Sequence, residues 1–162
     1  MKLPWPQIRR SLAALAITFL IACGTPPPTT NPVRPLDVEQ FQRMISAKEF
    51  NGVVAVFASW CPPCREELHD LAKLDRKAKP ENVQIIAVSI DRGDVSAVQI
   101  LVNRLALPFP IYYVGEPLAE KFQIAGVPTL IVVRQGRIVE KTPGQQSARQ
   151  LAAKLKMFDS GS

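Results

Sequence analysis

The feature that most restricts the fold of this chain is an apolar run followed directly by two cysteines and a helical pattern. Residues 53–58 are all apolar, residues 60–64 read Trp-Cys-Pro-Pro-Cys, and residues 65–78 carry apolar side chains at helical spacing. The pattern predicts a buried strand that leads the cysteines into the first turn of a helix. A helix start carries unpaired N–H groups and about half a positive charge, which favours an anion there. We therefore expect Cys61 to ionise readily and to act as a nucleophile.

The spacing of the two cysteines adds a second property. With two residues between them, the sulfur of Cys64 can close on that of Cys61 and form a reversible dithiol/disulfide couple. Cys64 lies one turn further into the helix, so we expect Cys61 to be exposed and Cys64 to be shielded. Two cysteines would also supply half of the four ligands of a zinc site. The other candidate ligands are only His69 and scattered carboxylates. The ligand count favours redox chemistry, and we predict neither a metal nor a cofactor.

The N-terminus is typical of an export signal. Lys2, Arg9 and Arg10 precede an apolar run at residues 11–22 that contains two polar residues. A bilayer span needs about 20 apolar residues, so this run is too short to cross a membrane but suits a signal peptide. We predict that residues 1–22 are a lipoprotein signal peptide and are removed.

Cys23 stands directly after this run and resembles the lipobox cysteine of bacterial lipoproteins. The resemblance implies cleavage before Cys23 and a diacylglycerol on its sulfur; the alternative is an ordinary signal peptide with an incidental cysteine. Gly24 follows in place of the Asp that marks inner-membrane retention in some bacteria. The sequence therefore does not decide whether the anchor lies in the inner or the outer membrane. We predict a lipidated cysteine and a Pro/Thr-rich tether at residues 23–35, then one domain at residues 36–162.

Charge and cysteine count restrict the partners. The 162 residues include 20 Lys and Arg against 14 Asp and Glu, a net charge of +6. Removing residues 1–22 takes away three positive charges and no negative ones, which leaves +3. No basic cluster interleaves with aromatic residues, so we predict no nucleic-acid partner. With one of three cysteines lipidated, only one pair remains, and no wider disulfide framework is possible.

The rest of the chain predicts alternating strands and helices. A capping box of Asp37 and Gln40 indicates a helix start, and Gln135-Gly136 indicates the turn of a hairpin. The order from residue 53 onward, β-α-β-α-β-α-β-β-α, predicts an α/β fold with a central mixed β-sheet sandwiched by α-helices. The predicted strands are residues 53–59, 83–90, 111–114, 130–133 and 138–141, and the predicted helices are residues 38–45, 65–78, 95–105, 117–122 and 148–158.

Three motifs together resemble thioredoxin-fold proteins, and among them the TlpA/ResA-like group of membrane-anchored periplasmic thiol-disulfide oxidoreductases. They are residues 57–67 around the cysteines, Gly-Val-Pro-Thr at residues 126–129, and Gly-Arg-Ile-Val at residues 136–139. The resemblance covers residues 36–158 and implies a thioredoxin-like fold.

The resemblance also implies an activity. Cys61 would form a mixed disulfide with a partner protein and Cys64 would resolve it, with reduction of substrate disulfides as the direction and cytochrome c maturation as a setting. The implied partners are disulfide-containing or dithiol proteins and a membrane redox partner. The implied location is the bacterial periplasm, on a membrane through the lipid on Cys23, with the protein a monomer. Two rival functions stay open: a dithiol oxidase, and a non-enzymatic copper-binding chaperone, since thiolates suit Cu(I).

Three further residues are candidates for substrate binding. Trp60 either packs on the domain or offers a flat contact surface beside the thiols. Pro128 is either an ordinary proline at a strand start or, as the resemblance implies, the cis residue opposite the cysteines. A cis proline there would leave the Val127 backbone free to pair with an extended substrate segment.

The chain departs from thioredoxin at two buried positions. The Asp six residues before the first cysteine is Ala55 here, and the Lys of the next strand is Ala87. Both members of a buried ion pair are absent together, so proton transfer needs another group. Some relatives carry a Glu six residues after the first cysteine, and this position is Glu67. Glu67 is therefore the candidate proton acceptor; the alternative is a surface charge that only complements the helix start. His69 replaces a proline common in this helix.

Overall fold

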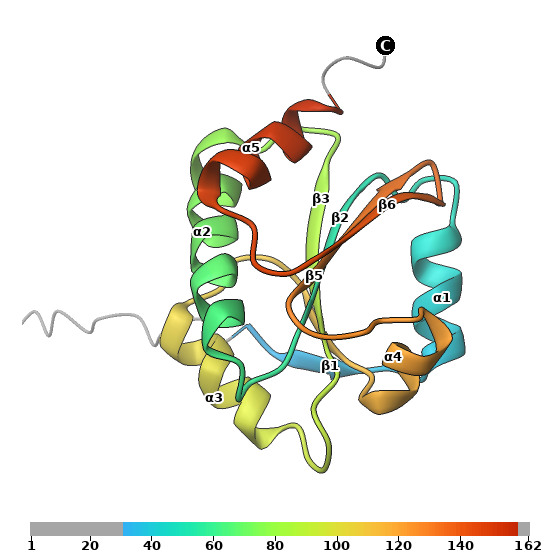
Figure 1. Ribbon diagram of the computed structural model, residues 1–162, viewed down its shortest axis with the longest axis vertical. Helices are drawn as coiled ribbons and strands as arrows, with labels where there is room; N and C mark the ends of the chain where they lie inside the picture. Colours follow the sequence, from blue (N-terminus) through green and yellow to red (C-terminus); the bar gives the residue numbers. More distant parts are fainter. Residues whose placement is uncertain (1–30, 159–162) are drawn as a thin grey trace, which may run out of the picture.

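The computed structural model describes residues 31–158, which form a six-stranded mixed sheet with helices on both faces (Figure 1). The predicted signal peptide and Cys23 lie outside the described residues. The strands are β1 (Val33–Pro35), β2 (Gly52–Phe57), β3 (Gln84–Ser89), β4 (Ile111–Tyr113), β5 (Thr129–Arg134) and β6 (Arg137–Pro143). The helices are α1 (Val38–Ser46), α2 (Pro62–Ala78), α3 (Ser96–Leu105), α4 (Glu116–Lys121) and α5 (Ala148–Lys156). The predicted α/β class with a central mixed sheet is confirmed.

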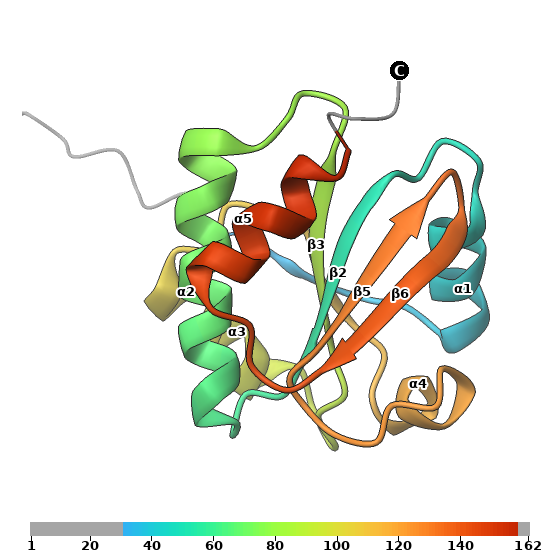
Figure 2. The ribbon, with the colours of Figure 1, turned by 45° about the horizontal axis from the view of Figure 1, so that its top comes forward.

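The strand order is β1-β4-β3-β2-β5-β6, with β2 near the centre. The pairs β1–β4, β4–β3 and β3–β2 are parallel, and β2–β5 and β5–β6 are antiparallel. Helices α2, α3 and α5 cover one face of the sheet, and α1 and α4 cover the other (Figures 1 and 2). Within residues 31–158, no helix has both the length and the apolar character needed to cross a bilayer.

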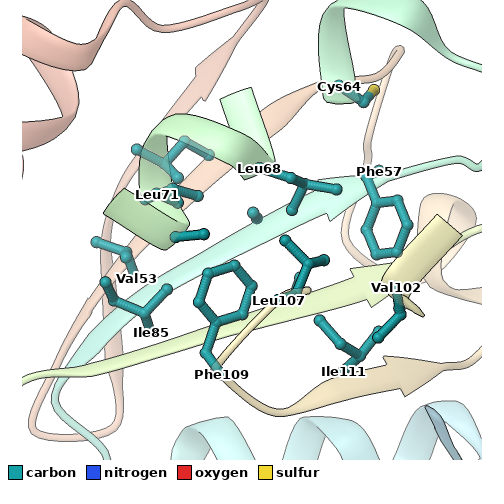
Figure 3. Close-up of a cluster of buried hydrophobic side chains, with 14 of the residues drawn as sticks. Val53, Phe57, Cys64, Leu68, Leu71, Ile85, Val102, Leu107, Phe109 and Ile111 are labelled. Atoms are coloured by element: carbon teal, nitrogen blue, oxygen red, sulfur yellow. The ribbon is translucent and has the colours of Figure 1, made fainter. Parts of the chain in front are cut away.

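The central strand β2 is buried along its whole length because both of its faces are covered. Val53, Ala55 and Phe57 belong to the core between the sheet and α2, and Val54 and Val56 belong to the core on the opposite face. Alternate residues of a strand point to opposite faces, so a doubly covered strand reads as a continuous apolar run. Figure 3 shows the first core, with Cys64 at the same end of the sheet as Phe57.

The positions that replace thioredoxin's buried ion pair lie side by side. Ala55 of β2 and Ala87 of β3 are partners in the parallel register, and both are buried. A charge at either position would be enclosed by apolar side chains, where an unpaired ion is costly. The two alanines therefore fit together, and neither can take part in proton transfer.

The structure differs from the sequence-based prediction at residues 31–35, which we assigned to the tether. Val33–Pro35 forms the edge strand β1, and Val33 is buried. The Asn31 side chain donates to the carbonyl oxygens of Leu107 (3.0 Å) and Phe109 (2.6 Å), which fixes the chain before the strand. A proline is tolerated on an edge strand because one side of its backbone makes no ladder bonds. The folded part therefore begins earlier than residue 36.

Helix α1 begins as predicted. The Asp37 carboxylate accepts a hydrogen bond from the Gln40 N–H (2.6 Å), and the Gln40 side-chain oxygen accepts one from the Asp37 N–H (3.0 Å). This reciprocal capping satisfies N–H groups that the helix start would otherwise leave unpaired.

Candidate active site

The start of α2 places the first cysteine at the helix cap. Cys61 is the N-cap residue, and Pro62 and Pro63 occupy the first helical positions, where a missing N–H costs nothing. The Cys64 N–H donates to the Cys61 sulfur over 3.3 Å. The chain therefore holds the Cys61 sulfur against the backbone N–H of Cys64 at the helix start, and this donor stabilises negative charge on the sulfur.

The two cysteines form a disulfide bond, with an S–S distance of 2.10 Å. Cys61 is 3% exposed and Cys64 is 1% exposed. The expectation of an exposed Cys61 is therefore wrong for this oxidised form, while the shielding of Cys64 is confirmed. The reason is that the first cysteine caps the helix under a neighbouring loop, at residues 126–128, instead of projecting from the surface.

That loop contains the predicted proline. The Val127–Pro128 peptide bond is cis, as expected. The carbonyl oxygen of Val127 lies 3.8 Å from the Cys61 sulfur, and Pro128 itself is buried. Two hydrogen bonds hold the loop: the Thr129 hydroxyl donates to the Gly126 carbonyl (2.7 Å), and the Gly144 N–H donates to the Pro128 carbonyl (2.9 Å). A segment 66 residues away in sequence is thereby fixed against the sulfur.

Glu67 is buried within α2, at 1% exposure. Its Oε2 accepts a hydrogen bond from the backbone N–H of Gln146 over 2.6 Å. Burial raises the pKa of Glu67 to about 7, because desolvation disfavours the charged form, and the Gln146 hydrogen bond opposes that rise. The reading of Glu67 as a surface charge is thus wrong. A carboxyl group that titrates near neutral pH lies three residues after Cys64, on the same helix face.

Gln146 is a residue that the sequence analysis missed. It is buried, and its side-chain amide donates to the Gly144 carbonyl over 3.0 Å. Gly144 also bonds to Pro128, so residues 144–146 connect the proline loop to the carboxylate of Glu67. No local pattern indicates this contact, because Gln146 and Glu67 are 79 residues apart.

A second missed group fixes the turn before the cysteines. Asp91 is buried, and its carboxylate accepts hydrogen bonds from the Ser59 N–H (2.8 Å), the Ser59 hydroxyl (2.5 Å) and the Ser89 hydroxyl (2.5 Å). The cluster ties the end of β3 to the residue two before Cys61, so it holds the cysteine turn in place. The sequence signal was present: Ser89 and Asp91 stand where a buried strand ends, at the edge of a sheet where functional groups gather.

The other candidate residues differ in exposure. Trp60 is 65% exposed, so it offers a contact surface beside the disulfide and does not pack into the domain. His69 is on the solvent face of α2, as expected. Among the side chains that the structure describes, no three His, Cys, Asp or Glu residues form a group that could hold a metal ion.

The chain is similar in sequence to known redox proteins. Residues 31–142 match the model of the AhpC/TSA family. The chain is 32% identical over 119 residues to the thiol-disulfide oxidoreductase ResA of Bacillus thuringiensis (strain Al Hakam), an alignment that covers 70% of this chain and 68% of the relative.

Solved structures show the same fold. StoA from Bacillus subtilis superposes with a TM-score of 0.58 at 22% identity, covering 65% of this chain and 82% of the other. A thiol:disulfide interchange protein of the thioredoxin family from Chlorobium tepidum TLS superposes with a TM-score of 0.61 at 21% identity, covering 72% and 83%. The fold is thus thioredoxin-like, and with the sequence matches these findings show that the chain belongs to the AhpC/TSA family, as a thiol-disulfide oxidoreductase related to ResA.

Proposed function

We propose that this thiol-disulfide oxidoreductase is held on a membrane outside the cytoplasm and reduces disulfide bonds of partner proteins. The observation that carries the proposal is the buried Cys61–Cys64 disulfide at the start of α2. A thiolate at Cys61 accepts the Cys64 N–H, but both sulfurs are shielded from water, which disfavours a free thiolate. The reduced form is therefore weakly stabilised, and the pair tends to give its electrons away.

The reduction proceeds in two exchanges. The Cys61 thiolate attacks one sulfur of the partner disulfide, the partner's S–S bond breaks, and its second cysteine leaves as a thiolate that takes a proton from water. Cys64 then gives its thiol proton to Glu67 and attacks the Cys61 sulfur. The mixed disulfide breaks, and the first partner cysteine leaves as a thiolate and is protonated. Two electrons have passed to the partner, and the chain ends as the disulfide seen in the structure.

Three residues beside the sulfurs suit substrate binding. The Val127 carbonyl lies 3.8 Å from the Cys61 sulfur, so an extended partner segment can pair with this backbone next to the reacting atom. Pro128 follows it and adds no N–H donor. Trp60, the residue directly before Cys61, supplies an exposed ring. A dithiol partner at the membrane would reduce the disulfide again, and cysteine pairs of cytochrome c precursors are the substrate class that the relation to ResA suggests.

The direction of electron flow predicts a low reduction potential. The Cys64 N–H stabilises the Cys61 thiolate, but burial disfavours both thiolates, so we expect a reduction potential below about −200 mV, towards the about −270 mV of thioredoxin. The chain would be equilibrated in glutathione buffers of known potential, and the disulfide fraction read by thiol alkylation and mass spectrometry. A potential near −120 mV, as in the strong oxidant DsbA, would instead make the chain a dithiol oxidase.

The anchor is the second part of the proposal. The basic residues and short apolar run before Cys23 support cleavage there and lipidation of its sulfur. We expect the native protein to begin at Cys23, to carry acyl chains and to partition into detergent, because each buried methylene contributes about 0.8 kcal/mol. Intact-mass analysis of the protein from its own host would check this. An unmodified Cys23 in that sample contradicts the anchor and leaves the chemistry of the Cys61–Cys64 pair untouched.

A further inference from the structure

One groove beside the active site is unused by the chemistry above. It has a volume of about 320 Å³ and lies between the cysteine turn and α3. The start of α2 and α3 are neighbours in both ribbon views (Figures 1 and 2). The groove is lined by Ser59, Trp60, Arg65, Ala97, Ile100, Leu101 and Arg104. Ser59 and Trp60 are the two residues before Cys61, so the groove is continuous with the reacting end of the molecule.

Two large apolar residues that line this groove are exposed. Trp60 is 65% exposed and Ile100 is 59% exposed, and these are the two most exposed large hydrophobic residues of the described chain. A single exposed apolar side chain needs no explanation, but two that border one groove form a patch that a partner can cover. Ala97, Ile100 and Arg104 recur at helical spacing, so one face of α3 presents both the apolar side chain and a positive charge.

The charges of the groove are both positive. Arg65 donates from Nε and Nη2 to the Ser59 carbonyl oxygen (3.3 and 3.0 Å), which holds its guanidinium at the groove. Within the described part of the chain, neither Arg65 nor Arg104 forms an ion pair with a carboxylate. On the other side of Trp60, a second groove holds Arg92, which is already paired with Glu116. The free positive charge at the tryptophan is thus on the α3 side.

We propose that this groove receives a segment of the disulfide-bearing partner protein in which an acidic residue stands next to an apolar one. The carboxylate would pair with Arg104 and Arg65, since guanidinium groups match carboxylates in a fork geometry. The apolar side chain would cover Ile100 and Trp60. This inference rests on the proposed function and adds a substrate preference to it: the groove selects partners by charge and orients their disulfide toward Cys61.

The test uses synthetic peptides with one internal disulfide that differ only at the flanking positions. The first peptide carries Asp-Leu, the second Lys-Leu and the third Asp-Ser. In each peptide the same dipeptide stands on both sides of the disulfide. The probe reaction is their reduction by the reduced full chain, which a small dithiol in the buffer regenerates after each turnover, followed as kcat/KM above the rate with the dithiol alone. We expect the wild type to favour Asp-Leu over Lys-Leu by roughly five-fold. Arg104→Glu should bring this ratio to one or below, and the wild-type preference should shrink at high salt.

A matched control separates local charge from net charge. Arg43 is also exposed, lies in the last turn of α1, and is on the opposite side of the sheet. Arg43→Glu makes the same charge change as Arg104→Glu. It also removes a cation from the last turn of a helix, where a positive charge is favourable. Its peptide ratio should stay at the wild-type value; an equal change in both variants overturns the proposal.

The apolar part has its own pair of variants. Ile100→Ser should raise KM for Asp-Leu by roughly five-fold, with much less effect on Asp-Ser. Val139 is 51% exposed on β6, and Val139→Ser is the control that should leave KM unchanged. Equal KM values for Ile100→Ser and the wild type contradict the groove. Failure of the wild type to reduce any peptide contradicts the proposed function instead, so the two failures are distinguishable.

Discussion

A chain in which Cys64 is replaced by serine is expected to remain covalently bound to its substrate. A serine hydroxyl cannot displace a thiolate from a disulfide, so the mixed disulfide at Cys61 has no internal route to resolution. Turnover should fall by roughly 10³-fold or more, because the residue supplies a covalent step. The reduced Cys64→Ser variant would be mixed with a disulfide peptide, quenched with acid and analysed by intact mass.

The structure gives two reasons for placing the trapped bond on Cys61. Its sulfur accepts the Cys64 N–H at the helix cap, which stabilises the attacking thiolate, and it lies beside the Val127 backbone. Exposure alone does not decide which cysteine attacks the substrate, because both residues are almost fully buried. The control is Cys61→Ser, which should form no adduct through Cys64. An adduct in Cys61→Ser and none in Cys64→Ser would reverse the roles.

The sequence predicted those parts of the fold that local patterns encode. The run at residues 53–58 identified β2 because a strand covered on both faces has no polar position. Asp37 and Gln40 identified the start of α1 because capping is a contact over three residues. The edge strand β1 was missed, since three residues give no periodicity and Pro35 argues against a strand.

The site was less predictable because its contacts are long-range. The position of Glu67 followed from a resemblance, but its hydrogen-bond donor, the Gln146 N–H, is brought near only by the folded chain. Asp91 supports the cysteine turn from 32 residues away. The expected exposure of Cys61 failed for the same reason: the loop at residues 126–128, which lies against its sulfur, is distant in sequence.

Replacing Glu67 by glutamine is expected to slow thiol–disulfide exchange by roughly 10²-fold or more, because the resolving thiol loses its proton acceptor. The amide oxygen of glutamine can still accept from the Gln146 N–H, so the segment that packs on α2 should stay in place. In the wild type the rate should rise with pH through the pKa of Glu67, about 7, as the carboxylate forms. Stopped-flow rates from pH 5 to 9 should show this inflection in the wild type and lack it in Glu67→Gln.

The same group should make stability depend on pH. In the folded chain the pKa of Glu67 is raised from 4.5 to about 7, so between these values the folded state holds a proton that the unfolded state has lost. The stabilisation is complete below pH 4.5 and is lost as pH rises through 7. A shift of this size corresponds to about 3 kcal/mol. Urea unfolding of the disulfide-bonded form should therefore show the wild type losing about this much stability across that interval relative to Glu67→Gln.

Glu66 provides the matched control for both measurements. It precedes Glu67 in the same helix turn, is exposed, and accepts from the Gln145 side chain over 2.8 Å. Glu66→Gln removes the same charge at the same distance from the helix start, so it reproduces any effect on the helix dipole. Only a proton acceptor at Glu67 predicts a slow Glu67→Gln beside a near-native Glu66→Gln. Equal rates in the two variants, with the inflection near pH 7 kept in both, would mean that Cys64 passes its proton directly to water.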